Sequence, residues 1–96
     1  STASIMGAFY EILNTSSNWL IKKGINKKIA KNYIAELFLS LSQDAANKQS
    51  KGFKKLVADS QTPKGLNMQV LKELQKGKFY FKFLKALDNV NKRVSK

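Results

Sequence analysis

Apolar residues recur every three or four positions along most of the chain, which is the spacing of one face of an amphipathic helix. The clearest stripe lies between residue 26 and about residue 49, and its members are Ala30, Tyr33, Ile34, Leu37, Phe38, Leu41 and Ala45. An earlier stripe, in residues 5–23, contains Ile5, Phe9, Ile12, Leu13, Trp19 and Leu20. No segment alternates strictly between apolar and polar residues, so no strand is predicted.

Three shorter helices are predicted in the second half of the chain, over about residues 51–59, 67–77 and 78–94. Residues with capping chemistry flank the predicted helices: the N-caps are Ser4, Asn26 and Asn67, and the closing glycines are Gly24 and Gly77. The pattern therefore predicts an all-α fold, a single bundle of about five helices that occupies residues 1–96 as one domain.

Several large apolar residues fall outside the stripes of their helices, namely Met6, Ile21, Leu39, Phe79 and Phe81. A domain of this length buries only about 60–70% of the surface of its unfolded chain, so these residues would stay exposed on a lone monomer. Contiguous exposed apolar surface commonly marks an association site. We therefore predict a homodimer whose interface contains Phe79, Phe81, Phe83 and Leu39. The alternative, an aromatic core within one chain, stays open.

The segment TPKGLN, Thr62–Asn67, contains the only proline of the chain and a glycine two residues later. Pro63 disfavours helical backbone at the preceding residue, which predicts a turn between two helices. Asn67 is placed to cap the helix that follows. The free N–H groups of this helix start, with the side chains of Lys64 and Asn67, could bind the carboxylate of a small substrate.

The formal net charge of +12 is high enough to suit nucleic acid or an anionic membrane surface. However, of the 18 Lys and Arg residues only Arg93 is an arginine, the residue that planar phosphate and guanine recognition favours. We interpret the lysines as a solvated surface and expect no nucleic-acid partner. No apolar run approaches the roughly 18 residues of a membrane span, so we also expect no membrane partner and a cytoplasmic location.

Few residues of this chain are of the types that act in catalysis or bind metals and nucleotides. The chain has no His and no Cys, which excludes thiol–imidazole catalysis and the common zinc sites. Its six Asp and Glu residues form no pair three or four positions apart, and its five glycines form no nucleotide-binding loop. We therefore predict no metal, no bound cofactor and no catalytic residue in this chain alone. A free-standing basic nucleic-acid-binding bundle and a helical adaptor for another protein remain as alternatives.

Three segments together carry a family resemblance, STASIMGAFYEIL, WLIKKGINKKIAKNYIAELFLSL and TPKGLNMQVLKELQKGKFYFKFLKAL. In this order and spacing they resemble the C-terminal helical domain of the pyrroline-5-carboxylate reductases, over nearly the whole chain. The resemblance implies a 6-phosphogluconate dehydrogenase C-terminal-like dimerisation domain, interlocked with a second copy. It also implies an N-terminal Rossmann domain that binds NAD(P)H and is absent from this chain, which starts at Ser1 as a fragment would.

The family's loop has the form S-P-G-G-T-T, and Thr62, Pro63 and Gly65 match its Ser, Pro and second Gly. Lys64 stands in place of the first Gly, and Asn67 in place of the second Thr, whose hydroxyl contacts substrate in the family. The family's helical domain opens with the motif S-G-S-G-P, and in this chain Thr2 and Ser4 keep the hydroxyl groups of its two serines. The resemblance thus implies the substrate-binding residues Ser4, Thr62, Pro63, Lys64, Gly65 and Asn67, and an imine or carbonyl substrate for the parent enzyme.

Overall fold

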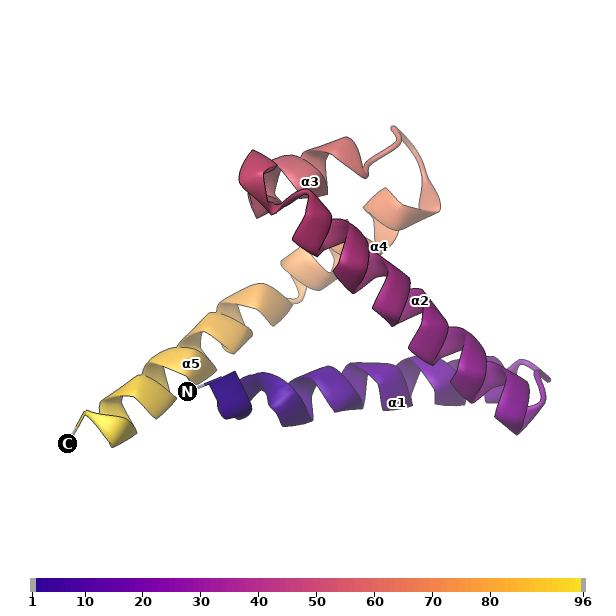
Figure 1. Ribbon diagram of the computed structural model, residues 1–96, viewed down its shortest axis with the longest axis horizontal. Helices are drawn as coiled ribbons and strands as arrows, with labels where there is room; N and C mark the ends of the chain where they lie inside the picture. Colours follow the sequence, from indigo (N-terminus) through magenta and orange to yellow (C-terminus); the bar gives the residue numbers. More distant parts are fainter. Residues whose placement is uncertain (1, 96) are drawn as a thin grey trace. The chain divides into compact units, whose positions relative to one another are not determined.

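The computed structural model describes residues 2–95, which form helices and no strand. The elements are η1 (Thr2–Ile5), α1 (Met6–Lys22), α2 (Lys27–Asn47), η2 (Gln49–Lys51), α3 (Phe53–Asp59), α4 (Leu66–Lys76) and α5 (Phe79–Val94), where η marks a 3-10 helix (Figure 1). Within the described residues, the prediction of an all-α fold with about five helices is therefore confirmed. The chain divides into two compact units, Ser1–Gly52 and Phe53–Lys96.

The turn between α1 and α2 follows from its sequence. Gly24 has a φ of 101°, and its N–H donates to the carbonyl of Ile21 over 3.0 Å, while the N–H of Ile25 donates to the carbonyl of Leu20 over 3.1 Å. This pair of bonds is the Schellman pattern, which needs a left-handed residue and therefore favours glycine. The Asn26 side-chain oxygen then accepts two backbone N–H bonds of α2, over 2.9 and 3.3 Å. Both capping predictions for this turn are confirmed.

In the first unit, α1 and α2 pack on each other near the turn and separate towards their other ends (Figure 1). At the crossing, Ala30 has none of its surface exposed, Ile34 has 6% exposed, and Ser17 is buried with its hydroxyl donating to the carbonyl of Asn14. Small residues at these positions let the two backbones approach, and Ile34 fills the space between them. This crossing is the core of the unit.

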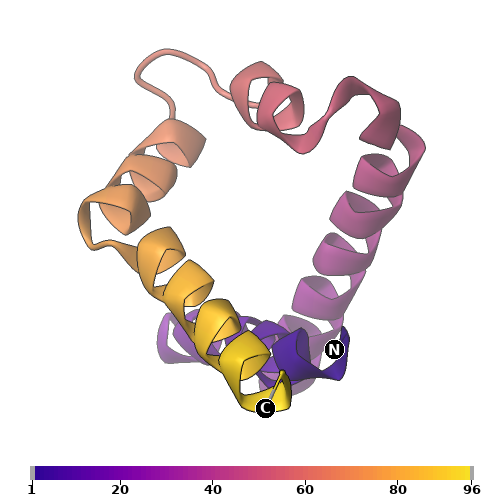
Figure 2. The same ribbon diagram turned by 90° about the vertical axis from the view of Figure 1, so that its left-hand side faces the viewer.

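The second unit has no buried side chain among its described residues. Its helix α5 leaves α4 after a bend at Gly77 and Lys78 and does not fold back alongside it (Figure 2). Lys78 has a φ of 62°, so the left-handed residue at this bend is the lysine, while the φ of Gly77 is −77°. The bend leaves the later turns of α5, with Leu84 and Val94, exposed.

Two predicted helix limits are corrected around Gly52. The helix α2 ends at Asn47, before the predicted residue 49, and α3 begins at Phe53 instead of residue 51. Gly52 has a φ of 84°, a left-handed backbone that cannot continue a helix, so the residues before it form the separate 3-10 turn η2.

Within residues 2–95, no helix is both long enough and apolar enough to cross a membrane. Nor do the described residues bring three or more His, Cys, Asp or Glu side chains together as metal ligands.

Candidate functional site

The loop between α3 and α4 contains a tight turn at Thr62–Gly65. The N–H of Gly65 donates to the carbonyl of Thr62 over 2.7 Å, with Pro63 and Lys64 as the two central residues. Pro63 supplies the φ that the first central position requires, and the φ of Lys64 is 63°. This is the pattern of a type II turn, in which the second central residue must be left-handed and is normally glycine or asparagine.

The space around position 65 leaves no room for a side chain, so glycine is required there. A Cβ atom at this position would lie 2.9 Å from the Thr62 carbonyl oxygen and 3.3 Å from the Thr62 Cβ. The neighbour at 2.9 Å is backbone, which cannot move aside without breaking the turn. The close approach of the two ends of the turn therefore favours glycine at position 65.

Lys64 occupies a backbone conformation that costs an L-residue about 1 kcal/mol or more relative to glycine. We therefore expect Lys64→Gly to raise the free energy of unfolding by about 1 kcal/mol, partly offset by the entropy of glycine in the unfolded chain. Urea denaturation followed by circular dichroism measures this change. Lys64→Ala removes the same charge but keeps the Cβ, so it should give no such gain; an equal gain from both variants would assign the effect to charge instead of strain.

The prediction that Asn67 caps α4 is wrong. The helix starts at Leu66 and its N-cap is Gly65, without a side-chain cap. The Asn67 side chain turns back instead, and its Nδ2 donates to the backbone carbonyl of Ser60 over 3.0 Å. Asn67 therefore ties the start of α4 to the residue that follows α3, closing the loop that contains the turn.

A hollow of about 460 Å³ lies beside the turn. Its walls are Lys64, Gly65, Met68, Gln69, Lys72 and Glu73. The sequence reasoning included the first two of these residues and missed the other four. Only part of the signal was present, because positions 68 and 72 are spaced by four and share one face of the predicted helix, whereas Lys64 precedes that helix and is placed by the turn. The hollow is lined by the cations Lys64 and Lys72 and by the carboxylate of Glu73, next to the positive end of the α4 dipole, so its lining carries a net positive charge that suits a small anion.

Ser4 lies in the first unit, whereas the other five predicted substrate-binding residues lie together in the α3–α4 loop and at the start of α4. The prediction that Ser4 is the N-cap of the first α-helix is wrong, because that helix starts later in the chain. Residues 2–5 form η1, and the N-cap position of α1 is Ile5. The side chain of Thr2 lies outside the described residues.

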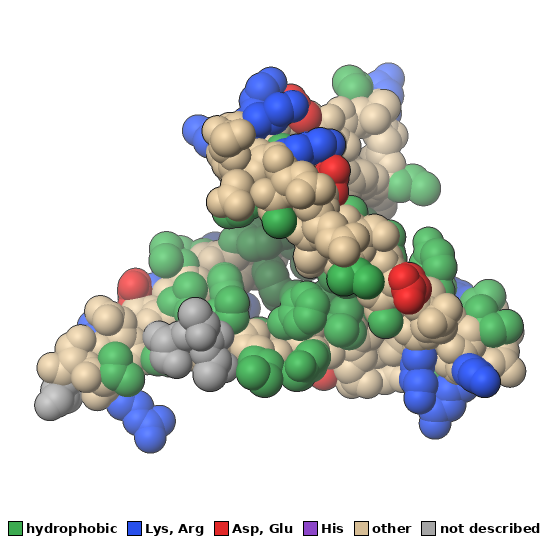
Figure 3. Space-filling model, in the orientation of Figure 1, with side chains coloured by type: hydrophobic (Ala, Val, Ile, Leu, Met, Phe, Trp, Pro, Cys, Tyr) green, Lys and Arg blue, Asp and Glu red, His purple; other side chains and the backbone are tan. Residues whose placement is uncertain are grey.

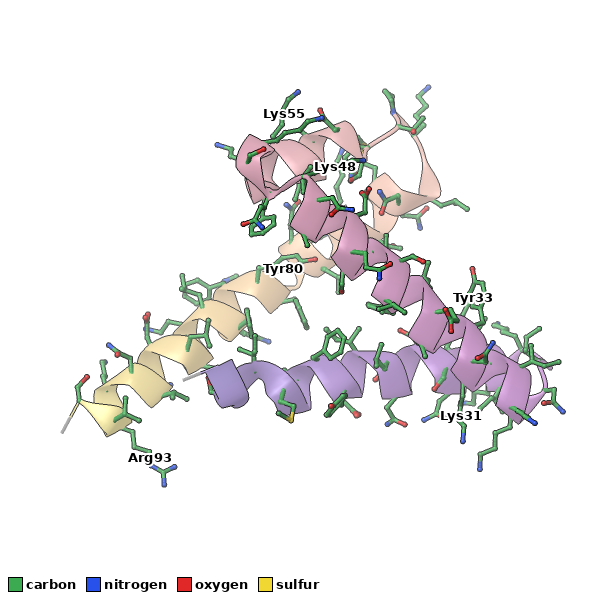
Figure 4. All side chains as sticks on the ribbon, in the orientation of Figure 1. Lys31, Tyr33, Lys48, Lys55, Tyr80 and Arg93 are labelled. Carbon is green, nitrogen blue, oxygen red and sulfur yellow. The ribbon has the colours of Figure 1, made fainter. Side chains whose placement is uncertain are left out.

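The protomer also exposes many large apolar side chains on its surface. Figure 3 shows apolar side chains on the surface over α1 and α5. The four predicted interface residues Leu39, Phe79, Phe81 and Phe83 are all exposed in the protomer. Phe81, with its neighbour Tyr80 (Figure 4), also lines a hollow of about 410 Å³ inside the second unit, opposite Val57 of α3 and Leu71 of α4. Tyr80 and Phe81 thus face residues of α3 and α4 across this hollow while remaining exposed, whereas Phe79 and Phe83 do not line it.

Residues 1–96, the whole chain, match the model of the family described as pyrroline-5-carboxylate reductase dimerisation. The chain belongs to this family. The resemblance read from the sequence is therefore confirmed. No curated protein and no solved structure matches the chain. Membership of a dimerisation family gives a reason for the exposed apolar residues of α5, since surface of this kind is normally covered by a partner.

Proposed function

We propose that this chain is the C-terminal dimerisation and substrate-contacting domain of a pyrroline-5-carboxylate reductase-like, NAD(P)-dependent oxidoreductase, and that it is inactive without a cofactor domain. The observation that carries the proposal is the family match over residues 1–96. We infer that the parent enzyme reduces an imine or carbonyl compound in the cytoplasm, as a step of proline biosynthesis. The alternative of a free-standing nucleic-acid-binding protein is not favoured, because the family match accounts for the whole chain.

A homodimer is the first part of the proposal. Helices of the length of α5, 16 residues, are marginal in water unless an apolar face is packed. Within its unit α5 contacts α4 next to the bend, and Phe83, Leu84 and Val94 stay exposed. A second copy, interlocked through the α5 faces, would cover these side chains and supply the packing that the protomer lacks.

Substrate contact is the second part. The hollow beside the Thr62–Gly65 turn would hold the carboxylate of the substrate, with Lys64 and Lys72 as cations and the α4 N–H groups as donors. The hydride would come from NAD(P)H on the missing Rossmann domain. The chain itself would bind and orient the substrate, because a fixed carboxylate positions the C=N or C=O bond for transfer. The bond from Asn67 to Ser60 keeps the loop in shape for this role.

The test is made on the full-length protein. We expect the reading frame upstream of Ser1 to encode a nucleotide-binding domain, and the full-length protein to oxidise NADPH or NADH when given pyrroline-5-carboxylate or a related imine. Lys64→Ala should raise KM about tenfold, which corresponds to one lost charge-assisted contact, with a smaller effect on kcat. The 96-residue chain alone should be inactive. An upstream sequence without a cofactor domain, or an inactive full-length dimer, would overturn the proposal.

A further inference from the structure

The end of the first unit around the α1–α2 turn carries a dense group of lysines. We define the basic tip as the exposed side chains of Lys22, Lys23, Lys27, Lys28 and Lys31 together with Ile25 and Ile29. Residues 12–35 contain these five lysines and no Asp or Glu. The ion pairs Lys48–Asp44 and Lys55–Asp59 lie elsewhere in the chain. Lys and Arg side chains gather at this end of the unit in Figure 3, and Figure 4 labels Lys31 among them.

Helix stability does not explain this arrangement. Lys22 and Lys23 end α1, where cations are favourable, but Lys27 and Lys28 stand in the first turn of α2, where the helix dipole is positive. Cations at that position are unfavourable until an anion approaches them. The tip is therefore a surface at which an anionic partner would relieve an existing repulsion.

Apolar side chains lie among the lysines. Ile25 is 41% exposed and Ile29 is 63% exposed, and the exposed ring of Trp19 stands one helical turn before Lys22 and Lys23. Lysine stems, isoleucine and tryptophan together suit the boundary between lipid headgroups and acyl chains. A nucleic-acid backbone offers no apolar surface for Ile25 and Ile29 to contact. The first unit also has no arginine, the residue that forms bidentate hydrogen bonds with phosphates and bases.

We propose that the basic tip binds the surface of an anionic lipid bilayer, with the lysines over the headgroups and Ile25 and Ile29 entering the interface. A helical hairpin end is convex, so it can touch a flat surface without a groove. The expectation of no membrane partner rested on the length of apolar runs, and a surface contact requires no such run. The inference does not depend on the proposed reductase function.

The test is co-sedimentation of the chain with vesicles of phosphatidylcholine, with and without about one-third phosphatidylserine. We expect binding to the anionic vesicles only, weakened by salt because exposed charges are screened. Trp19 is the only tryptophan, so its fluorescence should shift to shorter wavelength on binding. Each lysine near such a surface strengthens binding about fivefold, so the triple variant Lys23→Gln, Lys27→Gln, Lys28→Gln should bind about 100-fold more weakly.

The matched control is Lys76→Gln, Lys82→Gln, Lys85→Gln, which removes the same charge from exposed positions of the second unit. It should bind within a few-fold of the unchanged chain, and circular dichroism should show both variants folded. An equal loss in the control would mean diffuse attraction by net charge and would overturn the proposal. So would no binding to anionic vesicles, or tighter, equally tip-dependent binding to duplex DNA.

Discussion

Phe83→Asp is expected to convert the proposed dimer into a monomer at micromolar concentration. Phe83 is 38% exposed and lies on α5, outside the hollow that Tyr80 and Phe81 line within the chain. An aspartate there would place an unpaired charge in the apolar interface. Truncating a central aromatic residue of an interface typically costs about 2 kcal/mol. In a two-fold dimer the cost is incurred twice, which raises Kd about 1000-fold. Sedimentation equilibrium over a concentration series measures this change.

The control for this variant is Lys85→Asp, which places the same aspartate two residues further along α5, at an exposed polar position. It should leave Kd within a few-fold of its original value. High salt separates the two origins of association, because an apolar interface survives salt whereas charge-mediated association is screened. A monodisperse monomer of the unchanged chain, or equal effects of both variants, would contradict the α5 interface and return Phe83 to the core of one chain.

Ile34→Ala is expected to lower the free energy of unfolding by about 2–4 kcal/mol, the range for removing a large buried aliphatic side chain. Ile34 is one of the few buried side chains of the first unit and lies at the α1–α2 crossing beside Ala30. Its loss would leave a void at the crossing, which the remaining contacts between the two helices, such as the Phe9–Phe38 ring pair, do not fill. Urea denaturation at fixed protein concentration is the measurement, since dimerisation would add a concentration-dependent contribution.

Ile29→Ala is the matched control, because it makes the same chemical change in the same helix at a side chain that is 63% exposed. Ile29→Ala should change the free energy of unfolding by no more than about 0.5 kcal/mol, because the higher helix propensity of alanine offsets part of any lost contact. Equal losses at both positions would show that the α1–α2 crossing is not the core of the unit, or that Ile29 is buried in the dimer.

Sequence reasoning succeeded where local chemistry decides the structure. The apolar spacing predicted five helices, and Gly24 and Asn26 were placed correctly as the closing and opening residues of α1 and α2. A Schellman turn and an asparagine cap involve only residues within a few positions of each other, so their energetics can be read from the sequence. The exposure of Phe79 and Phe81 was likewise predicted, because both fall outside the apolar stripe of their helix on a thin domain.

Prediction from the sequence failed where a residue could adopt two local arrangements and a contact with a residue several positions away stabilised one of them. Asn67 could cap α4 or turn back, and its bond to the carbonyl of Ser60 chose the second. Pro63 and Gly65 predicted a turn, but the pattern did not show that Lys64 would take its left-handed position. The four further residues lining the hollow were not predicted, because their place beside the turn depends on how the loop leads into α4.

The amino-acid sequence was sufficient to predict the helical class of this chain, its family, the turn at residues 24–26 and the presence of more apolar surface than one small domain can bury. Periodicity, caps and composition carry this information because they depend on neighbours three or four positions away. The tertiary structure was needed to show that Ala30, Ile34 and Ser17 are the buried residues in the described part of the first unit, that Asn67 holds the loop closed, and that the α4–α5 bend leaves Leu84 and Val94 exposed. These outcomes depend on distances between helices, which local propensities do not specify.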